Sequence, residues 1–125
     1  EDNLVINSYP GLYSQIITNL IVNSIKHGFK EKNDGVISID AINDNNIFKI
    51  IYKDNGQGIK EEYLSKVFEP FFTTSRESGG TGLGMHIVYN LVTQQLKGLI
   101  KCESLIGEGV KFTISIPVII SDAEK

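Results

Sequence analysis

Two pairs of alternating apolar runs constrain the fold of this chain more than any other feature of its sequence. In each pair, a few turn-forming residues separate two runs in which apolar and polar residues alternate. Alternation with a period of two predicts half-buried strands, and such short separations predict antiparallel hairpins. The first hairpin joins "GVISIDAI" (35–42) to "IFKIIYK" (47–53) through "NDNN" (43–46), and the second joins "LIKCES" (99–104) to "VKFTISIPV" (110–118) through a Gly107–Gly109 turn. The chain is therefore expected to build a mainly antiparallel sheet.

The remaining segments predict helices and one further strand. Pro10 and Gly11 precede a helix expected over 12–27, and Gly28 is its expected end. The apolar stripe of this helix is formed by Tyr13, Ile16, Ile17, Leu20, Ile21 and Ile25. Further helices are expected over 60–68 and 82–96, a short strand over 4–8, and a glycine-containing loop over 69–81. This order predicts an α+β fold, a two-layer sandwich of a mixed, mainly antiparallel sheet with about three helices on one face.

Composition excludes several classes of protein. The chain has 125 residues, which fit one domain over 1–125, and it begins with Glu1 and not Met, which suggests a piece of a longer protein. A net charge of −3 argues against a nucleic-acid partner, because binding a phosphate backbone needs a basic face. No apolar run reaches the roughly 18 residues of a membrane span, so no membrane contact is expected of this segment. The lone Cys102 cannot form a disulfide within the chain, which favours a reducing compartment.

The segment "KDNGQGI" (53–59) places the carboxylate of Asp54 where a strand ends. A carboxylate there can accept a hydrogen bond from an exocyclic amine such as that of adenine. Gly56 and Gly58 lack a Cβ, so their backbone can approach a flat ring closely. The plainer interpretation is an ordinary turn, since Asp, Asn and Gly are common turn residues.

The helix over 12–27 carries a polar cluster beside its apolar stripe. Asn19, Asn23, Lys26 and His27 fall within an arc of roughly 100° at helical spacing. An Asn oxygen can bind a hard metal ion, and Lys is a point charge for phosphate. Taken alone, the pattern also fits polar residues at the edge of an amphipathic helix, and that interpretation is then the better one.

A third element is "GGTGLGM" (79–85), where glycines run directly into a helix. Exposed N–H groups and the helix dipole at such a start favour a phosphate. The Walker A arrangement is absent.

Taken together and in this order, these elements resemble the catalytic, ATP-binding domain of a bacterial sensor histidine kinase, a member of the Bergerat-fold (GHKL) superfamily. That superfamily also contains type II topoisomerases, heat-shock chaperones and mismatch-repair ATPases. "NLIVNSIKHG" resembles its N box, "DNGQGI" its first glycine box, "VFEPFFTTS" its F box, and "GGTGLGMHIVYNLV" its second glycine box. "GEGVKFTISIP" resembles the closing strands, so the resemblance covers nearly the whole chain.

The resemblance implies a role for each matching residue. Asn23 would coordinate Mg²⁺ at the phosphates of ATP, supported by Asn19, and Lys26 and His27 would contact phosphate; Asn19, Asn23 and Lys26 would be the catalytic residues. Asp54 would receive the adenine amine and would have no partner within the protein. The other nucleotide contacts would be Gly56, Gly58, Ile59, Phe68, Arg76, Gly80, Thr81, Gly82, Leu83 and Gly84.

A lid over 69–81 would close on ATP, anchored by Phe68, Phe71 and Phe72, with Gly80, Gly82 and Gly84 as its flexible points. It would be mobile without ligand and would sense the γ-phosphate. Similar kinases often carry Lys after "FFTT"; here Ser75 stands there, and Arg76 would supply the charge.

The resemblance further implies a kinase and not a hydrolase. Superfamily members that hydrolyse ATP carry a Glu general base where this chain has Asn19, and an amide cannot take a proton from water. The phosphoacceptor His would lie on a separate dimerisation domain, since neither His27 nor His86 has that context, and a response regulator would follow. The implied location is cytoplasmic, in a full-length protein that can be anchored in the inner membrane. The alternatives are an anti-sigma-factor-type serine kinase and a nucleotide-binding module without catalysis.

Overall fold

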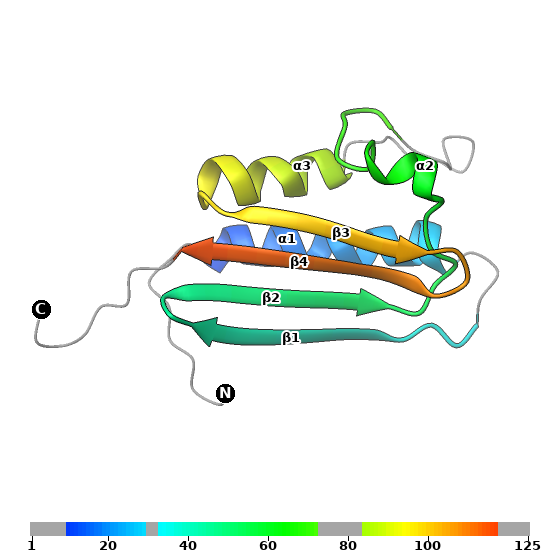
Figure 1. The fold of residues 1–125 in the computed structure, drawn as a ribbon, viewed down its shortest axis with the longest axis horizontal. Helices are drawn as coiled ribbons and strands as arrows, with labels where there is room; N and C mark the ends of the chain where they lie inside the picture. The colour runs from blue at the N-terminus through cyan, green and yellow to red at the C-terminus, as the bar shows by residue number, and fades with distance from the viewer. Residues whose placement is uncertain (1–9, 30–32, 73–83, 118–125) are drawn as a thin grey trace, which may run out of the picture.

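The computed structural model describes residues 10–29, 33–72 and 84–117. Over these residues the chain forms two layers, a four-stranded antiparallel sheet and helices packed on one of its faces (Figure 1). The strand order is β1-β2-β4-β3. This arrangement confirms the predicted α+β sandwich, while the strand expected over 4–8 lies outside the described residues.

The first hairpin consists of β1 (Ile37–Asp44) and β2 (Ile47–Asp54). Asp44 pairs with Ile47, so the turn is only Asn45 and Asn46, with φ values of 51° and 65°. Asn tolerates this left-handed conformation, which matches the twist of a two-residue hairpin turn. The strands therefore extend further into "NDNN" than the sequence predicted.

The second hairpin consists of β3 (Leu99–Leu105) and β4 (Gly109–Pro117), and β4 also pairs with β2. Its turn needs glycine, because Gly107 and Gly109 have φ values of 87° and 86°. Pairing with β2 places the end of this turn beside Asp54, whose strand partner is Val110. The sheet thus brings two turns together at one end.

Two of the predicted helices end in a π turn. α1 (Pro10–Asn23) continues into η1 (Ser24–Gly28), and α3 (Gly84–Asn90) continues into η3 (Leu91–Gln95). A π turn bonds each residue to the fifth residue before it, which turns the following side chains away from the helical stripe. Ile25 is accordingly 60% exposed, so its predicted place in the apolar stripe is wrong.

The helix predicted over 60–68 is limited to α2 (Glu61–Leu64). Beyond it the chain advances by three-residue turns, with Lys66 N bonded to Tyr63 O and Glu69 N to Lys66 O. Pro70, which has no N–H, follows directly and cannot continue a helix.

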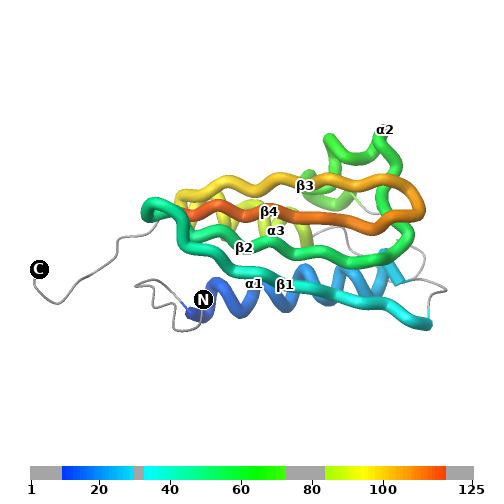
Figure 2. The backbone as a smooth tube through the Cα atoms, turned by 60° about the horizontal axis from the view of Figure 1, so that its bottom comes forward, coloured from blue at the N-terminus to red at the C-terminus, as the bar shows by residue number. Residues whose placement is uncertain are grey.

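The core lies between the sheet and the paired helices α1 and α3, which contact each other along the sheet (Figure 2). Alternate residues of β2 and β4 face this layer, as the period-two pattern predicted. The fully buried side chains include Ile16, Leu20, Tyr52, Val88, Val92, Phe112, Ile114 and Ile116. This packing presses the C-terminal end of α1 against the end of β2.

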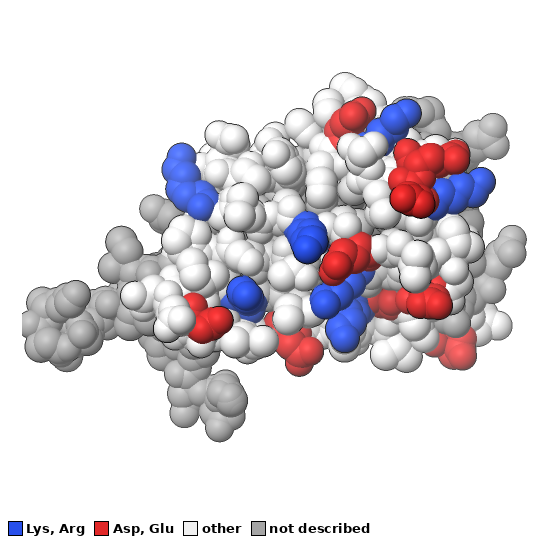
Figure 3. Space-filling model, in the orientation of Figure 1, with Lys and Arg blue, Asp and Glu red and all other residues white. Residues whose placement is uncertain are grey.

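The opposite face of the sheet is open, and its charged side chains of both signs are intermixed (Figure 3). Lys111 Nζ lies 4.0 Å from a carboxylate oxygen of Glu103 on the neighbouring strand. Exposed pairs of this kind contribute little to stability.

Candidate nucleotide-binding site

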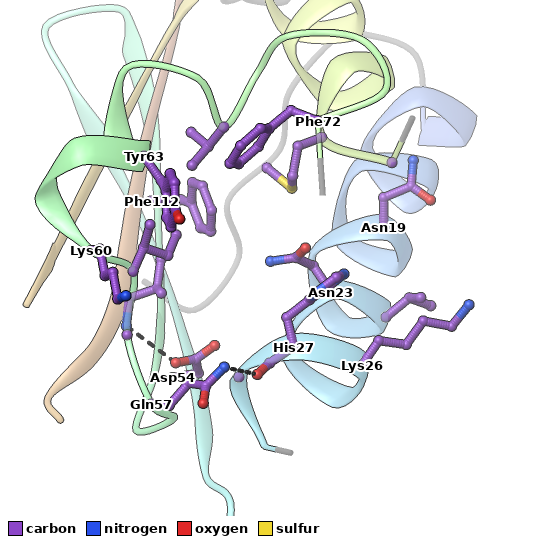
Figure 4. A pocket seen from close by; sticks show the side chains of 18 of the residues that line it. Asn19, Asn23, Lys26, His27, Asp54, Gln57, Lys60, Tyr63, Phe72 and Phe112 are labelled. Atoms are coloured by element: carbon purple, nitrogen blue, oxygen red, sulfur yellow. Dashed lines mark hydrogen bonds between the residues drawn. The ribbon is translucent and has the colours of Figure 1, made fainter. Parts of the chain in front are cut away.

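A cleft of about 430 Å³ opens between the end of α1, the loop after β2, α2 and the start of α3 (Figure 4). Its size falls within the range of small-molecule sites. It brings together eight of the residues that the sequence predicted for a nucleotide site: Asn19, Asn23, Lys26, His27, Asp54, Gly58, Ile59 and Gly84. Residues from separate motifs thus converge on one cleft.

Asp54 stands at the base of the cleft, where β2 ends, and is only 7% exposed. Its Oδ1 accepts the backbone N–H groups of Gly56 at 3.0 Å and Val110 at 3.1 Å, and its Oδ2 accepts the Ser24 hydroxyl at 2.6 Å. The prediction that Asp54 has no partner within the protein is therefore wrong, because a carboxylate this deeply buried needs donors. A carboxylate has about four acceptor positions, so one remains, and it is on Oδ2.

Two hydroxyl groups lie behind Asp54 and connect it to α1. Ser24 Oγ is 2.6 Å from Tyr52 Oη, and Tyr52 Oη is 3.0 Å from the carbonyl oxygen of Leu20. Burial raises the pKa of the Tyr52 phenol, an effect that the Ser24 hydrogen bond opposes and the charge of Asp54 reinforces. The phenol is therefore a neutral donor at physiological pH.

Glycines allow the loop after β2 to approach η1 and β3. A Cβ built on Gly56 would lie 2.4 Å from the carbonyl oxygen of Gly28, and one on Gly28 would lie 3.0 Å from Oδ2 of Asp54. Gly58 has a φ of +83°, and its Cβ would lie 2.2 Å from the carbonyl oxygen of Leu105. Gly58 lines the cleft as predicted, whereas Gly56 is buried against Gly28 and does not, so its glycine serves packing and not the ligand.

The rest of this loop is held by hydrogen bonds to the surrounding elements. Gln57 N donates to Gly28 O at 2.8 Å and its side-chain Nε2 to His27 O at 2.9 Å, which links the loop to α1 (Figure 4). Ile59 N donates to Ser104 Oγ at 2.8 Å on the other side. The loop is thus held by hydrogen bonds on both of its sides.

The polar cluster of α1 faces the cleft and not open solvent alone. Asn19, Asn23 and Lys26 follow one another along the helix beside the cavity in Figure 4. The Asn19 Nδ2 atom is buried and has no hydrogen-bond partner among the described residues. These side chains provide amide oxygens and a cation along the helical side of the cleft. The edge-of-helix interpretation alone does not account for an unsatisfied buried amide.

The three phenylalanines predicted to anchor the lid behave differently. Phe68 packs its ring on Tyr89 and Phe112, with centroids 5.4 and 6.3 Å away, and is an anchor to the core and not part of the cleft lining. Phe72 lines the cleft and contacts the ring of Tyr63 at 5.5 Å. Phe71 is 61% exposed, has a left-handed backbone with a φ of 67°, and does not line the cleft.

Several residues of the cleft were not identified from the sequence. Gly28 was interpreted only as a helix end, Met85 only as part of a helix and Phe112 only as part of a strand, although all three also line the cavity. Lys60 precedes α2 and Tyr63 lies in it, and their position just after the glycine turn was the one available signal. The apolar part of the cleft lining consists of side chains that include Tyr63, Val67, Phe72, Met85 and Phe112. The predicted contacts at Arg76, Gly80, Thr81, Gly82 and Leu83, and most of the lid, lie outside the described residues.

The residues at the cleft fit a nucleotide-bound magnesium ion more than a metal site built by protein alone. Within the described ranges, no group of three or more His, Cys, Asp or Glu side chains is placed to hold a metal. Asn23 offers an amide oxygen, which suits Mg²⁺ when phosphates and water complete its shell. Asn19 lies one turn before Asn23, and its Nδ2 group has no hydrogen-bond partner among the described residues. This amide is therefore available as a polar partner beside Asn23.

The two-layer fold and a cleft lined by a buried carboxylate, two amides and a lysine define an ATPase domain. The chain belongs to the family of histidine kinase-, DNA gyrase B- and HSP90-like ATPases, whose model matches residues 9–120.

Curated relatives and solved structures point to the histidine kinase branch of this family. The chain is 38% identical over 124 residues to the sensor histidine kinase AtsR of Burkholderia thailandensis, covering 93% of this chain and 20% of the relative. It is 39% identical over 116 residues to the sensor histidine kinase ZraS of Escherichia coli O157:H7, covering 93% and 24%. The chain thus spans about a fifth to a quarter of the length of these relatives.

Among solved structures, the nucleotide-free catalytic domain of histidine kinase ThkA matches with a TM-score of 0.78 and 30% identity, over 94% of this chain and 74% of that one. Full-length ShkA in complex with AMPPNP matches with a TM-score of 0.75 and 26% identity, over 96% and 24%. The chain is therefore an ATPase domain of the histidine kinase type. Within the described part of the chain, no helix has the length and apolar character that crossing a membrane requires.

Proposed function

We propose that this domain binds Mg-ATP in the cleft and donates the γ-phosphate to a histidine on a dimerisation domain elsewhere in the full-length protein. The single observation that carries the proposal is Asp54. It is a buried carboxylate with all but one of its acceptor positions filled by the chain, and it lines a cleft of ligand size. An adenine amine is the donor that this position suits.

The two ends of the cleft would divide the nucleotide between them. The base would lie near Asp54, with its flat faces against the apolar wall that includes Met85 and Phe112. The phosphates would lie toward Asn23 at the end of α1 and Lys26 on η1. Mg²⁺, when bound, neutralises charge on the phosphate oxygens, and Asn23 with Asn19 are the residues that would hold it.

The residues of the cleft favour transfer to an acceptor that is already nucleophilic. Asp54 is the only carboxylate among the described lining residues, and three donors already occupy it. Asn19 cannot act as a base toward water. A neutral imidazole needs no such base, which supports a histidine acceptor.

The relatives support the wider setting. AtsR and ZraS are sensor histidine kinases, and ShkA was solved with AMPPNP, an ATP analogue, bound. Because the chain spans only part of such proteins, we infer that residues 1–125 act as one catalytic domain of a longer, cytoplasmically facing kinase. Its further partner would be a response regulator, in two-component signalling.

Calorimetric titration of the domain with ADP and ATP, with and without Mg²⁺, tests the proposal. Adenine nucleotides should bind, and GTP should bind more weakly, because its 6-oxo group places an acceptor against Asp54. No heat and no thermal shift at millimolar nucleotide would reject it. Adding the upstream domain should then yield an acid-labile phosphohistidine; an acid-stable phosphoserine would indicate a different acceptor.

A further inference from the structure

A buried pair of hydroxyl groups behind Asp54 has no part in the roles assigned above. Ser24 is 1% exposed and Tyr52 is fully buried, on α1's π turn and on β2 respectively. Neither hydroxyl lines the cleft. Both nevertheless connect to Oδ2, the Asp54 oxygen that still has an acceptor position.

Counting protons fixes the direction of these hydrogen bonds. The two hydroxyls have two protons for three contacts: Ser24 to Asp54 at 2.6 Å, Ser24 to Tyr52 at 2.6 Å, and Tyr52 to Leu20 O at 3.0 Å. The ionised carboxylate is the strongest acceptor, so it takes the Ser24 proton. The short contact between the two hydroxyls then needs the Tyr52 proton. The chain of donors therefore runs from Tyr52 to Ser24 to Asp54, and Tyr52 shares its proton with Leu20 O at the longer distance.

Tyr52 also occupies the acceptor that would compete for Ser24. A serine inside a helix can turn its hydroxyl back to the carbonyl four residues earlier, which for Ser24 is that of Leu20. The Tyr52 hydroxyl lies against this same carbonyl. Its presence therefore leaves Asp54 as the acceptor for Ser24.

The Ser24 hydrogen bond matters because the two backbone donors, Gly56 N and Val110 N, bind only Oδ1. Rotation about the Cβ–Cγ bond moves both oxygens, and the Ser24 hydroxyl is the donor that opposes this movement at Oδ2, the oxygen with the open acceptor position. On one side Oδ2 lies close to Gly28: a Cβ built on Gly28 would lie 3.0 Å from Oδ2. Ser24 thus sets the plane of the carboxylate and the direction of the position that remains open.

We propose that Tyr52 and Ser24 are positioning residues for purine specificity: they orient Asp54 so that its last acceptor position receives a ring amine and rejects a ring carbonyl. This inference rests on the proposed function, in which Asp54 receives the base. The pKa of Tyr52, raised chiefly by burial, keeps the phenol protonated as a donor throughout the physiological range.

The experiment compares two ligands that differ only at the amine. ADP and purine riboside 5′-diphosphate, which has hydrogen in place of the 6-amino group, are titrated with Mg²⁺ into the wild type, Tyr52→Phe and Ser24→Ala. Tyr13→Phe is the matched control, because it removes another buried hydroxyl, one without a hydrogen-bond partner among the described residues, from a ring packed on Phe48. Tyr52→Phe keeps the ring that packs on Phe112.

We expect Tyr52→Phe and Ser24→Ala to weaken ADP about threefold to tenfold, and to leave the analogue lacking the amine within about twofold of the wild type. Tyr13→Phe should change neither ligand. Equal weakening of both ligands would show a structural role only, and unchanged ADP affinity in a folded variant would show no role; either result overturns the proposal.

Folding is checked by urea unfolding before titration. If Tyr52→Phe does not fold, Ser24→Ala decides by the same ratio, and failure of both to fold overturns the proposal in favour of a structural requirement. A wild type that binds both ligands equally would instead show that Asp54 does not receive the amine. That outcome would reject the proposed function itself, and is recognised before any variant is measured.

Discussion

The backbone N–H of Val110 donates to Oδ1 of Asp54 at 3.1 Å, although the two residues are 56 positions apart in the chain. β4 thereby supplies one of the donors that keep a carboxylate buried at the end of β2. A cross-strand donor of this kind orients the side chain before any ligand arrives.

Asp54→Asn should weaken ADP binding by about 1.5–3 kcal/mol, roughly tenfold to a hundredfold, and should erode the preference over GDP. The single oxygen of Asn can meet the two backbone donors, which leaves an amide NH₂ facing the adenine amine. Titration calorimetry measures the effect, with Asp40→Asn on exposed β1 as control. An unchanged affinity for ADP would remove Asp54 from the base site.

Asn23→Ala should slow phosphoryl transfer by about tenfold or more while changing nucleotide affinity less, because its amide would act on charge that develops in the transition state. The rate is measured with the acceptor domain present. Asn90→Ala, on α3 and outside the cleft lining, is the matched control. Near-normal transfer by Asn23→Ala would contradict the assignment.

Lys26→Ala should weaken ATP about twofold to fivefold, with the difference shrinking at high salt, because Lys26 is exposed and its charge is screened. Adenosine, which has no phosphate, should bind equally to the variant and the wild type. Lys53→Ala, on the exposed end of β2, controls for the loss of one positive charge. A loss of the same size for adenosine would place Lys26 near the base and not the phosphates.

Gly56→Ala should lower the free energy of unfolding by about 1–3 kcal/mol, since its Cβ would stand 2.4 Å from the backbone oxygen of Gly28. Gly11→Ala is the matched control: nothing lies within 4 Å of its Cβ, and alanine should raise helix stability by up to about 1 kcal/mol. Urea unfolding measures both. Equal stabilities for Gly56→Ala and the wild type would mean that the loop can move away from α1.

Cys102 links stability to alkaline pH, because burial, followed by the charges of Glu103 and Asp54, raises the pKa of its thiol from 9.0 to about 12. The thiol ionises at a lower pH in the unfolded chain than in the folded chain. The stability that the neutral thiol contributes to the folded state is therefore fully present below pH 9 and is lost as the pH rises from 9 to about 12. Between these values the wild type should lose up to about 1 kcal/mol more per pH unit than Cys102→Val. Parallel curves of unfolding free energy against pH would refute the raised pKa.

Local pattern was sufficient for much of the fold. Alternation along β2 and β4, the glycines at 107 and 109, and the helical spacing of α1 all express rules that act over a few residues. The same is true of Asp54, Asn23 and Lys26, since each stands at a fixed place relative to the end of its own strand or along its own helix. These predictions needed no knowledge of which elements meet.

The sequence by itself therefore determined the elements and the chemical groups of the site. Only the tertiary structure decided what surrounds Asp54: the hydroxyls of Ser24 and Tyr52, and the close approach of Gly28 to Gly56. It also decided that Phe71 is exposed while Phe68 is packed in the core. The physical reason is that each of these outcomes depends on contacts between elements far apart in the chain, whose packing sets the burial and hydrogen-bond partners of a side chain, and periodicity within one element contains no information about them.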